Sequence, residues 1–342
     1  MKSEQSGGRA CQQKRNGDKN MIIIHLEDNM NNQFYGILPD IVDDIIANYN
    51  ESDLLLGKTE KKLPVRSTII DILNDLRRLL FPDYFNADRV DMNNAVYFTG
   101  QILSNLHKKL LHQVALALAY NDQIHSADSP EILQKSEDIC CNFFKTIPLI
   151  QQKIFLDVQA GYDGDPAAKS KEQVVISYPG LYAIFVYRIA HELYKMHVPF
   201  IPRTMTEYAH SKTGIDINAG ATIGQYFFMD HGTGIVIGET TVIGDYVKLY
   251  QGVTLGALST RGGQRLAGVK RHPTIGDRVT IYSNATILGG ETVIGKDSVI
   301  GGGAFITSSI PEKTRVSVTP PELSIKNDVK ATLSATNYIY EI

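Results

Sequence analysis

The sequence predicts an α+β protein in which an all-helical N-terminal part precedes a solenoid of short strands. Aliphatic residues recur every six positions at Ile237, Ile243, Leu249 and Leu255, and the spacing resumes at Ile275. A six-residue period fits neither the 3.6-residue period of a helix nor the two-residue period of an isolated strand. It is typical of a solenoid in which each strand stacks on its equivalent one coil away.

The N-terminal part has helical spacing from about residue 35 to 205. An apolar stripe between Ile69 and Leu80 stops at Pro82, and residues 95–120 continue the pattern. Ser129-Pro130-Glu131 combines a cap, a first-turn proline and a carboxylate near the positive helix end. We therefore expect a disordered leader over residues 1–34, a helical domain over 35–213, a solenoid over 214–312 and a flexible tail over 313–342.

Composition indicates an ordinary soluble protein. The chain has 342 residues, of which 43% are hydrophobic and 21% charged, and a formal net charge of -3 that favours neither nucleic acid nor an anionic membrane. Its three cysteines have neither zinc-site nor CxxC spacing, and an odd count suggests a reducing compartment. No stretch approaches the roughly 18 to 20 apolar residues of a membrane span. We expect a cytoplasmic protein.

His231 interrupts the repeat. The six-step spacing runs to Ile235, but Ile237 follows only two residues later, and this insertion beside a histidine suggests a shaped pocket. Asp230 precedes the histidine, and Asp216 could reach the same groove. A carboxylate on one imidazole nitrogen would strengthen the other as a base. A solvated histidine at a turn explains the residues equally well.

A second histidine, His272, ends a long polar loop over residues 257–274. Arg271 beside it could clamp a carboxylate, although a solvated basic loop is an alternative. The stretch from Gly256 to Gly263 offers backbone amides and cations that suit phosphates and a pantetheine amide. We expect no metal site, because the repeat region has too few converging ligands for zinc. A serine nucleophile is not favoured either.

These motifs together resemble the serine O-acetyltransferases, a family of hexapeptide-repeat acyltransferases that open cysteine biosynthesis. The resemblance covers roughly residues 160–310, and Tyr187 to His191 is similar to the last helix of that family. It is most specific in three segments: Met229-Asp230-His231-Gly232-Thr233-Gly234, Gly252-Val253-Thr254-Leu255-Gly256 and Arg271-His272-Pro273.

The resemblance implies a left-handed parallel β-helix, trimers or hexamers, and active sites in grooves between neighbouring subunits. It implies that His231 is the general base and that Asp216 orients it. The other implied roles are as follows: Asp165 and Asp230 hold the serine ammonium, Arg271 holds the carboxylate, His272 completes the pocket, and Gly256, Ala257, Thr260 and Arg261 face acetyl-CoA. Acetyl-CoA is thus expected as a co-substrate, without a permanently bound cofactor.

Three departures from the family pattern concern coenzyme A contacts and regulation. Asn218-Ala219 replaces the usual His-Pro, Gly256-Ala257 replaces a double glycine, and the loop before Arg271 is longer by residues 264–270. The resemblance also implies feedback inhibition by cysteine and a complex in which the terminal Ile342 enters O-acetylserine sulfhydrylase. The alternatives are an acetyltransferase for another amino acid or a sugar, and a non-catalytic scaffold that binds the sulfhydrylase.

Overall fold

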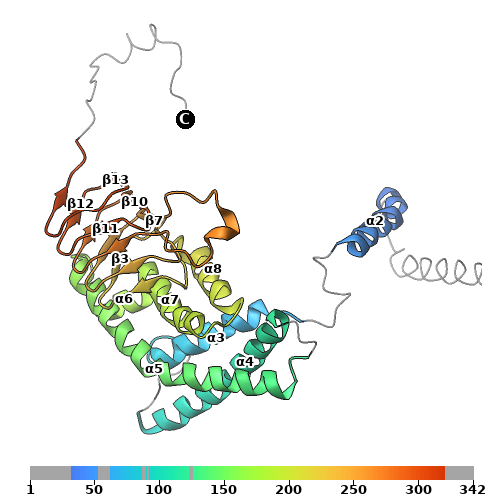
Figure 1. Ribbon diagram of the computed structural model, residues 1–342. Coiled ribbons are helices and arrows are strands. Elements are labelled where there is room, and N and C mark those ends of the chain that lie inside the picture. Colours follow the sequence, from blue (N-terminus) through green and yellow to red (C-terminus); the bar gives the residue numbers. More distant parts are fainter. Residues whose placement is uncertain (1–31, 53–61, 87–89, 91, 123–125, 320–342) are drawn as a thin grey trace, which may run out of the picture. The chain divides into compact units, whose positions relative to one another are not determined.

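The structure is a computed structural model that describes residues 32–52, 62–86, 90, 92–122 and 126–319 (Figure 1). The chain divides into two compact units, Met1–Lys62 and Leu63–Ile342. Most of the predicted leader, and the predicted flexible tail from residue 320 onward, lie outside the described residues.

The first unit contains one described helix, α2 (Asn32–Glu51), which begins inside the range of the predicted leader. Large apolar side chains repeat at three- and four-residue intervals along it, including Phe34, Ile37, Ile41 and Ile45, and these are exposed. The sequence therefore gives α2 an amphipathic face.

The second unit begins with a set of packed helices. Helix α5 starts as its sequence predicts: the Ser129 Oγ accepts a hydrogen bond from the Ile132 N–H at 3.3 Å, and Pro130 occupies the first turn. The bounds are α3 (Arg66–Leu80), α4 (Ala95–Asn121), α5 (Pro130–Gly164), α6 (Lys171–Ser177), α7 (Pro179–Lys195) and α8 (Ile201–Thr213), with a 3-10 turn at Met92–Asn94.

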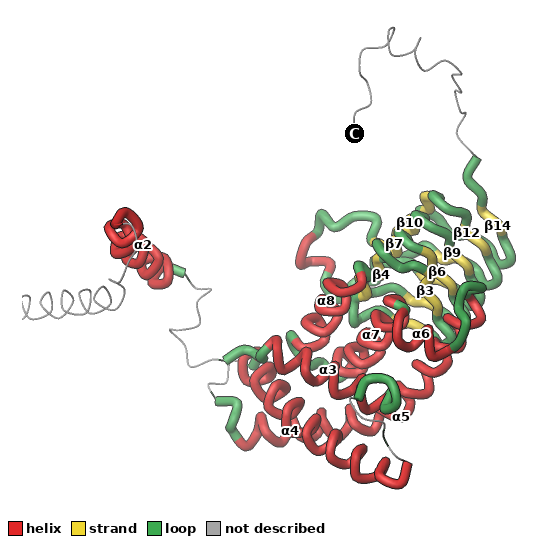
Figure 2. The backbone as a smooth tube through the Cα atoms, turned by 180° about the vertical axis from the view of Figure 1, so that it is seen from behind, coloured by secondary structure: helices red, strands yellow, loops and turns green. Residues whose placement is uncertain are grey.

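A parallel β-solenoid follows helix α8, and Figure 2 shows its short strands stacked in successive coils. Sheet A has the order β1-β4-β7-β10-β13, sheet B β11-β8-β5-β2 and sheet C β14-β12-β9-β6-β3. The predicted fold class is thereby confirmed. The strand bounds are β1 (Asp216–Ile217), β2 (Thr222–Ile223), β3 (Phe228–Asp230), β4 (Val236–Ile237), β5 (Val242–Ile243), β6 (Lys248–Tyr250), β7 (Thr254–Gly256), β8 (Thr274–Ile275), β9 (Thr280–Ile281), β10 (Thr286–Leu288), β11 (Val293–Ile294), β12 (Val299–Ile300), β13 (Phe305–Ile306) and β14 (Arg315–Val316).

The six-residue repeat places one inward-facing aliphatic on each strand. In sheet A, Ile217 pairs with Ile237, Ile237 with Leu255, and Leu255 with Ile287. Equivalent side chains therefore stack in a column along the solenoid. All four are buried. Burying each such side chain contributes roughly 1.5–3 kcal/mol, which explains why the aliphatic position is the most regular feature of the repeat.

Besides the long loop between β7 and β8, the repeat has two smaller irregularities, and both fall in turns between strands. The extra residue before Ile294 is absorbed between β10 and β11, where Gly289 has a φ of 106°. The insertion after Met229 widens the turn between β3 and β4, where His231, Gly232 and Gly234 all have positive φ. The solenoid thus keeps its register while the turn at His231 differs from its neighbours.

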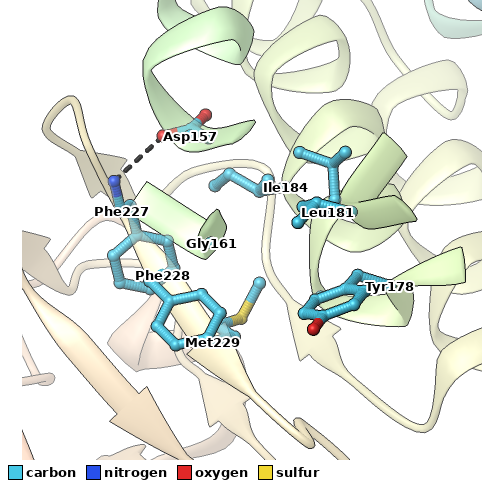
Figure 3. Close-up of a pocket in the computed structure, with 10 residues that line it drawn as sticks. Asp157, Gly161, Tyr178, Leu181, Ile184, Phe227, Phe228 and Met229 are labelled. Atoms are coloured by element: carbon cyan, nitrogen blue, oxygen red, sulfur yellow. Dashed lines mark hydrogen bonds between the residues drawn. The ribbon is translucent and has the colours of Figure 1, made fainter. Parts of the chain in front are cut away.

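Helices α5 and α7 pack against the first coil through polar contacts as well as apolar ones. The buried Arg188 side chain joins Asp157 through Nε and Nη2, at 2.5 and 2.8 Å, and Asp157 accepts the Phe227 N–H at 3.0 Å. Figure 3 shows Asp157 and Phe227 beside a cavity of about 10 Å³, whose lining includes Tyr178 and Met229. A cavity this small holds at most about one water molecule, so the helices and strand β3 are closely packed here.

Within the described ranges, no single helix is long and apolar enough to cross a membrane. One pair of described helices, α6 and α7 taken together, reaches the necessary length and composition, and the two are bent by 73° at the break between them.

Candidate active site

The turn from β3 to β4 presents His231 to solvent. His231 has a φ of 58°, which is uncommon for a residue other than glycine, and 71% of its side chain is exposed. The neighbouring Gly232 N–H donates to the Asp230 carbonyl at 2.6 Å. The His231 Nδ1 lies 3.7 Å from the Asp230 carboxylate, which is too long for a hydrogen bond.

Asp165 lies close to this turn, at the C-terminal end of helix α5. Its carboxylate accepts hydrogen bonds from the Tyr178 hydroxyl at 2.5 Å and from the Ala167 N–H at 2.8 Å. The Tyr178 bond is the main reason why the pKa of Asp165 is lowered, and the charge of His231 contributes. Burial, followed by Asp165 and Asp230, raises the pKa of Tyr178 to about 12. We call Asp165, Tyr178, Asp230 and His231 the His231 half-site.

Two residues here were not predicted from the sequence: Tyr178, which belongs to the half-site, and Lys248, which lies beside it. Lys248 donates to the Gly164 carbonyl at 3.0 Å, so strand β6 holds the end of helix α5 beside Asp165. Tyr178 is the residue before Pro179 and reaches Asp165 across thirteen positions. The sequence could have drawn attention to Lys248, because a charged residue on a solenoid strand is unusual. It could not have predicted the contact of Tyr178 with Asp165, which depends on how α5 and α7 pack.

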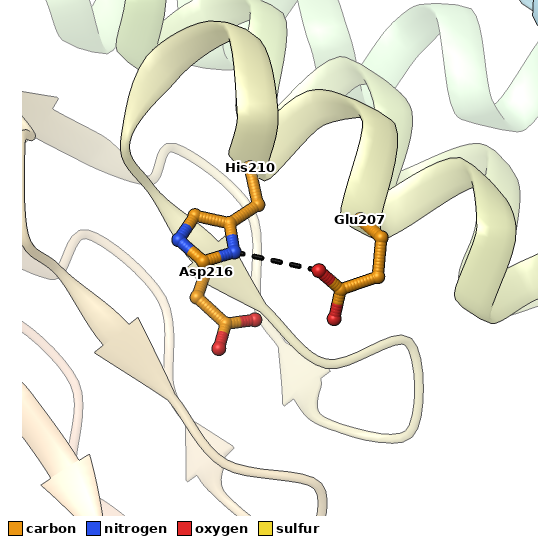
Figure 4. A group of neighbouring side chains, drawn as sticks. All are labelled: Glu207, His210 and Asp216. Atoms are coloured by element: carbon orange, nitrogen blue, oxygen red, sulfur yellow. Dashed lines mark ion pairs between the residues drawn. The ribbon is translucent and has the colours of Figure 1, made fainter. Parts of the chain in front are cut away.

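Asp216 lies in a different environment from the one implied for it. It is near Glu207 and His210 of helix α8 (Figure 4), with possible ligand atoms of the three residues within 4.8 Å of one another. His210 Nδ1 is 3.5 Å from Glu207, which also pairs with Arg203. Among the described residues, Asp216 has no hydrogen bond or ion pair to His231. Its role in orienting His231 therefore stays a prediction.

Arg271 is held by several neighbours where the long loop rejoins the solenoid. Its Nη2 pairs with Glu239, and its Nη1 donates to the carbonyls of Leu266 at 3.1 Å and Val269 at 3.4 Å. Burial opposes ionisation of Glu239, but hydrogen bonds from Arg271 and Tyr194 leave its pKa lowered overall. Arg271 is therefore held in one orientation. Among the described residues its Nε–H and one Nη2–H have no partner, so they remain for an anion.

His272 packs against the turn that follows strand β4. Its Nδ1 lies 3.1 Å from the Thr240 N–H and 2.9 Å from the Thr240 hydroxyl. Burial, then the positive charges of Arg271 and Lys270, lower the pKa of His272 to about 4 against an opposing effect of Glu239. We call Glu239, Thr240, Arg271 and His272 the His272 half-site.

The residues expected to face acetyl-CoA lie at the end of strand β7 and in the loop after it; β7 runs parallel to β4, so both strands end at the same edge of sheet A. Gly256 ends β7, and Ala257 opens the loop to the short 3-10 turn Gly263–Leu266. Thr260 and Arg261 are exposed. The loop thus offers exposed backbone and the cation of Arg261. Ile342 lies outside the described residues.

Sheet A separates the two half-sites within one chain. The turn carrying His231 leads into strand β4, whereas Glu239 and Thr240 follow β4. No hydrogen bond or ion pair joins the half-sites among the residues that the structure describes. One half-site has carboxylates and an exposed imidazole, and the other has an arginine and N–H donors. Together they suit a substrate with an ammonium, a hydroxyl and a carboxylate.

A parallel β-solenoid built on six-residue repeats, with an exposed histidine at one turn, a buried histidine at another and a cationic loop, defines an acyltransferase of the hexapeptide-repeat class. No family model matches the chain. The serine acetyltransferase named "plasmid" of Synechococcus elongatus is 42% identical over 231 residues, which are 66% of this chain and 72% of that protein. The Bacillus subtilis serine acetyltransferase is 49% identical over 121 residues, covering 35% of this chain and 53% of that one.

Solved structures agree. Entamoeba histolytica serine acetyltransferase 1 in complex with L-cysteine has a TM-score of 0.63 and 35% identity, covering 75% of this chain and 88% of that one. Isoform 3 of the same organism, in complex with cysteine, has a TM-score of 0.64 and 32% identity, covering 88% and 99%. This chain belongs to the serine acetyltransferase family.

Proposed function

We propose that this protein transfers the acetyl group of acetyl-CoA to the hydroxyl of L-serine, giving O-acetyl-L-serine and coenzyme A, the first step of cysteine biosynthesis. The similarity to the Synechococcus serine acetyltransferase carries this proposal. The chemical content of the two half-sites supports it, since one attracts an ammonium group and the other a carboxylate.

In the His231 half-site, His231 acts as the general base. Its Nδ1 faces Asp230, so Nε2 is the nitrogen that takes the serine hydroxyl proton. Asp165 and Asp230 hold the serine ammonium. Asp165 is suited to this because its hydrogen bonds from Tyr178 and Ala167 favour its ionised form. Asp216 orients His231 in this proposal.

In the His272 half-site, Arg271 receives the serine carboxylate and His272 completes the pocket. The anchoring of Arg271 by Glu239 and two loop carbonyls supports this role, because an arginine fixed in advance loses little freedom on binding. Gly256, Ala257, Thr260 and Arg261 face acetyl-CoA. Its phosphates suit the charge of Arg261, and its amides suit exposed backbone.

The chemical step is a direct transfer. The serine oxygen loses its proton to His231 and attacks the thioester carbonyl carbon, which forms the new C–O bond. The C–S bond then breaks, and the departing coenzyme A sulfur takes the proton from His231. Holding both substrates in one groove supplies a large part of the rate enhancement.

The active site is shared between subunits of a trimer in this proposal, because sheet A separates His231 from His272 in one chain. Mixing His231→Ala subunits with His272→Ala subunits tests it. At a serine concentration well below the wild-type KM, each variant alone is expected to be nearly inactive, His231→Ala because it lacks the base and His272→Ala because it binds serine weakly. Under the same conditions, reassembled mixtures are expected to recover roughly a quarter to a third of the wild-type rate if sites form from two chains at random. Mixtures that stay inactive would mean that each site is built by one chain.

The main test measures free coenzyme A thiol released from acetyl-CoA with L-serine, with homoserine, with a panel of sugars and with no acceptor. We expect serine-dependent release that His231→Ala reduces by roughly 10²- to 10⁴-fold. Release with another acceptor but not with serine would mean that the enzyme acetylates that acceptor instead of serine. Silence with every acceptor would favour a scaffold. The comparisons do not favour either alternative.

Two further interactions belong to the proposal. L-Cysteine inhibits the enzyme, since cysteine resembles serine, and both Entamoeba structures named above are complexes with cysteine. O-Acetylserine sulfhydrylase binds the terminal Ile342, because capture of a C-terminal carboxylate is a known recognition mode.

A further inference from the structure

The Thr240 hydroxyl has an unambiguous hydrogen-bond role beside His272. Its Oγ1 accepts the backbone N–H of Arg271 at 2.9 Å and that of His272 at 3.1 Å. Because these two bonds occupy its acceptor capacity, its own proton is left to donate. The acceptor within reach is the His272 Nδ1, 2.9 Å away.

The backbone of Thr240 points the same way. Its N–H also donates to the His272 Nδ1, at 3.1 Å. A nitrogen that faces two donors carries no proton, so the neutral ring of His272 has its proton on Nε2. Lys270 holds the arrangement together, because its Nζ donates to the carbonyls of Thr240 and His272 and to that of Pro273.

The Nε2 edge of the ring lies over Gly238, where an added Cβ would overlap the ring atoms Cδ2 and Nε2. His272 Nε2 has no hydrogen-bond partner among the described residues. Among the described residues, two fully buried side-chain nitrogen or oxygen atoms lack a partner, Thr241 Oγ1 and Gln251 Oε1, and His272 Nε2 is not one of them. Nε2 therefore reaches the surface, and its N–H is available to a ligand.

The charges around the ring disfavour a second proton. Arg271 and Lys270 lie close to it, Glu239 is the opposing carboxylate, and burial adds to their effect, consistent with the lowered pKa of His272. A proton on Nδ1 would also point at two donors, the N–H and the O–H of Thr240. Geometry and charge therefore agree on one neutral form.

We propose that Thr240 is a positioning residue that fixes His272 as a neutral Nε2–H tautomer, so that His272 only donates a hydrogen bond and takes no proton during the reaction. The recipient is an acceptor oxygen of the substrate beside Arg271. This last part rests on the proposed function, in which that oxygen belongs to the serine carboxylate. The two histidines of the active site then have opposite tasks, proton acceptor and hydrogen-bond donor.

The ring can be observed directly in the full chain. Solid-state ¹⁵N spectra of histidine-labelled, sedimented protein separate protonated from unprotonated ring nitrogens, and the spectrum of His272→Gln assigns the His272 signals. We expect His272 to give one protonated Nε2 and one unprotonated Nδ1, unchanged from pH 8 to about pH 5. A protonated Nδ1, or an imidazolium at pH 7, would overturn the proposal.

Matched variants test the part played by Thr240. Thr240→Val removes the hydroxyl at nearly constant volume and is expected to give a mixture of tautomers, whereas Thr240→Ser keeps the hydroxyl and should restore the wild-type spectrum. A wild-type spectrum in Thr240→Val would exclude a positioning role for the hydroxyl. This result does not depend on the substrate, so it is distinct from failure of the proposed function.

Activity supplies a second readout. His272→Gln places an amide donor near the position of Nε2 but provides no base. We expect it to keep the wild-type pH profile of kcat and a serine KM below that of His272→Ala. Thr240→Val should raise the serine KM roughly threefold to tenfold with a smaller effect on kcat, as expected for one weakened hydrogen bond. A pH profile that loses a limb in His272→Gln would mean that His272 transfers a proton.

Discussion

Arg188 on helix α7 and Asp157 on helix α5 form a bidentate ion pair that is almost completely buried, with 3% and 0% of their side chains exposed. The pair also binds the solenoid backbone, since Arg188 Nη2 donates to the Gly224 carbonyl at 2.9 Å and Asp157 accepts the Phe227 N–H. The helices and the first coil are thereby joined directly below the strand that carries Asp230.

Breaking this pair should destabilise the protein strongly. We expect Arg188→Met to lower the free energy of unfolding by about 3–5 kcal/mol, because it leaves the Asp157 carboxylate buried without its partner. Urea unfolding measures the change. The exposed pair of Arg278 and Asp297 is a matched control, and Arg278→Met there should have a much smaller effect on the free energy of unfolding. Equal effects in both variants would contradict the assigned importance of burial.

The bond between Tyr178 and Asp165 should make part of the stability depend on pH. The folded-state pKa of Asp165 is lowered, so its contribution is present above the ordinary Asp pKa of about 3.9 and is lost as the pH falls through the folded value. Tyr178→Phe should therefore reduce the free energy of unfolding by about 1 kcal/mol at pH 5 to 7, a modest amount for a partly exposed pair.

Below pH 4 this difference should shrink, because the wild-type carboxylate becomes protonated as well. Urea unfolding of both proteins from pH 3 to 7 measures it. Asp165→Asn is the control, since the amide oxygen can still accept the Tyr178 hydroxyl but does not titrate, and in this background the difference should not change with pH. A gap that widens on acidification would show that Tyr178 stabilises the protein in another way.

Gly238 should be required for the position of His272. A Cβ at residue 238 would overlap the imidazole, so Gly238→Ala is expected to displace the ring and lower kcat/KM for serine roughly tenfold to a hundredfold. The control is Gly100→Ala in helix α4, where nothing lies within 4 Å of the added atom. That change should raise stability by roughly 0.5–1 kcal/mol and leave turnover unchanged. Full activity in Gly238→Ala would refute the close packing.

Removal of Ile342 should separate catalysis from complex formation. We expect the shortened chain to keep its turnover and to lose binding to purified O-acetylserine sulfhydrylase, whereas His231→Ala should do the reverse. Calorimetric titration of each variant with the sulfhydrylase measures binding, and thiol release measures turnover. A shortened chain that still binds with the wild-type affinity would exclude the terminal residue as the contact.

The solenoid could be predicted from the sequence because each strand needs one buried aliphatic residue, and that residue recurs at a regular spacing. Ile237 and Leu255 are separated by three steps of six residues and face inward in register. The turn at His231 was also visible, since an insertion must widen one turn when the strands keep their pairing. The handedness of the coil was implied only by the family resemblance, since spacing alone carries no information about it.

The surroundings of the site residues could not be predicted in the same way. Tyr178 reaches Asp165, and Thr240 reaches His272, because separate elements pack together at distances of 13 and 32 residues along the chain. Six-residue periodicity describes neither contact. Asp216 illustrates the same limit, since its nearest charged neighbours come from helix α8, outside the repeat.

The residues proposed for catalysis lie no farther along the chain than Pro273, yet the solenoid continues to Val316. Coils stacked in this way interact mainly with their immediate neighbours, and each adds about 4.8 Å along the axis. A whole coil could therefore be added to or removed from this last part of the solenoid while the coils before it keep their contacts. Such a change would move the point where the C-terminal segment leaves the body without disturbing the chemistry at the other end.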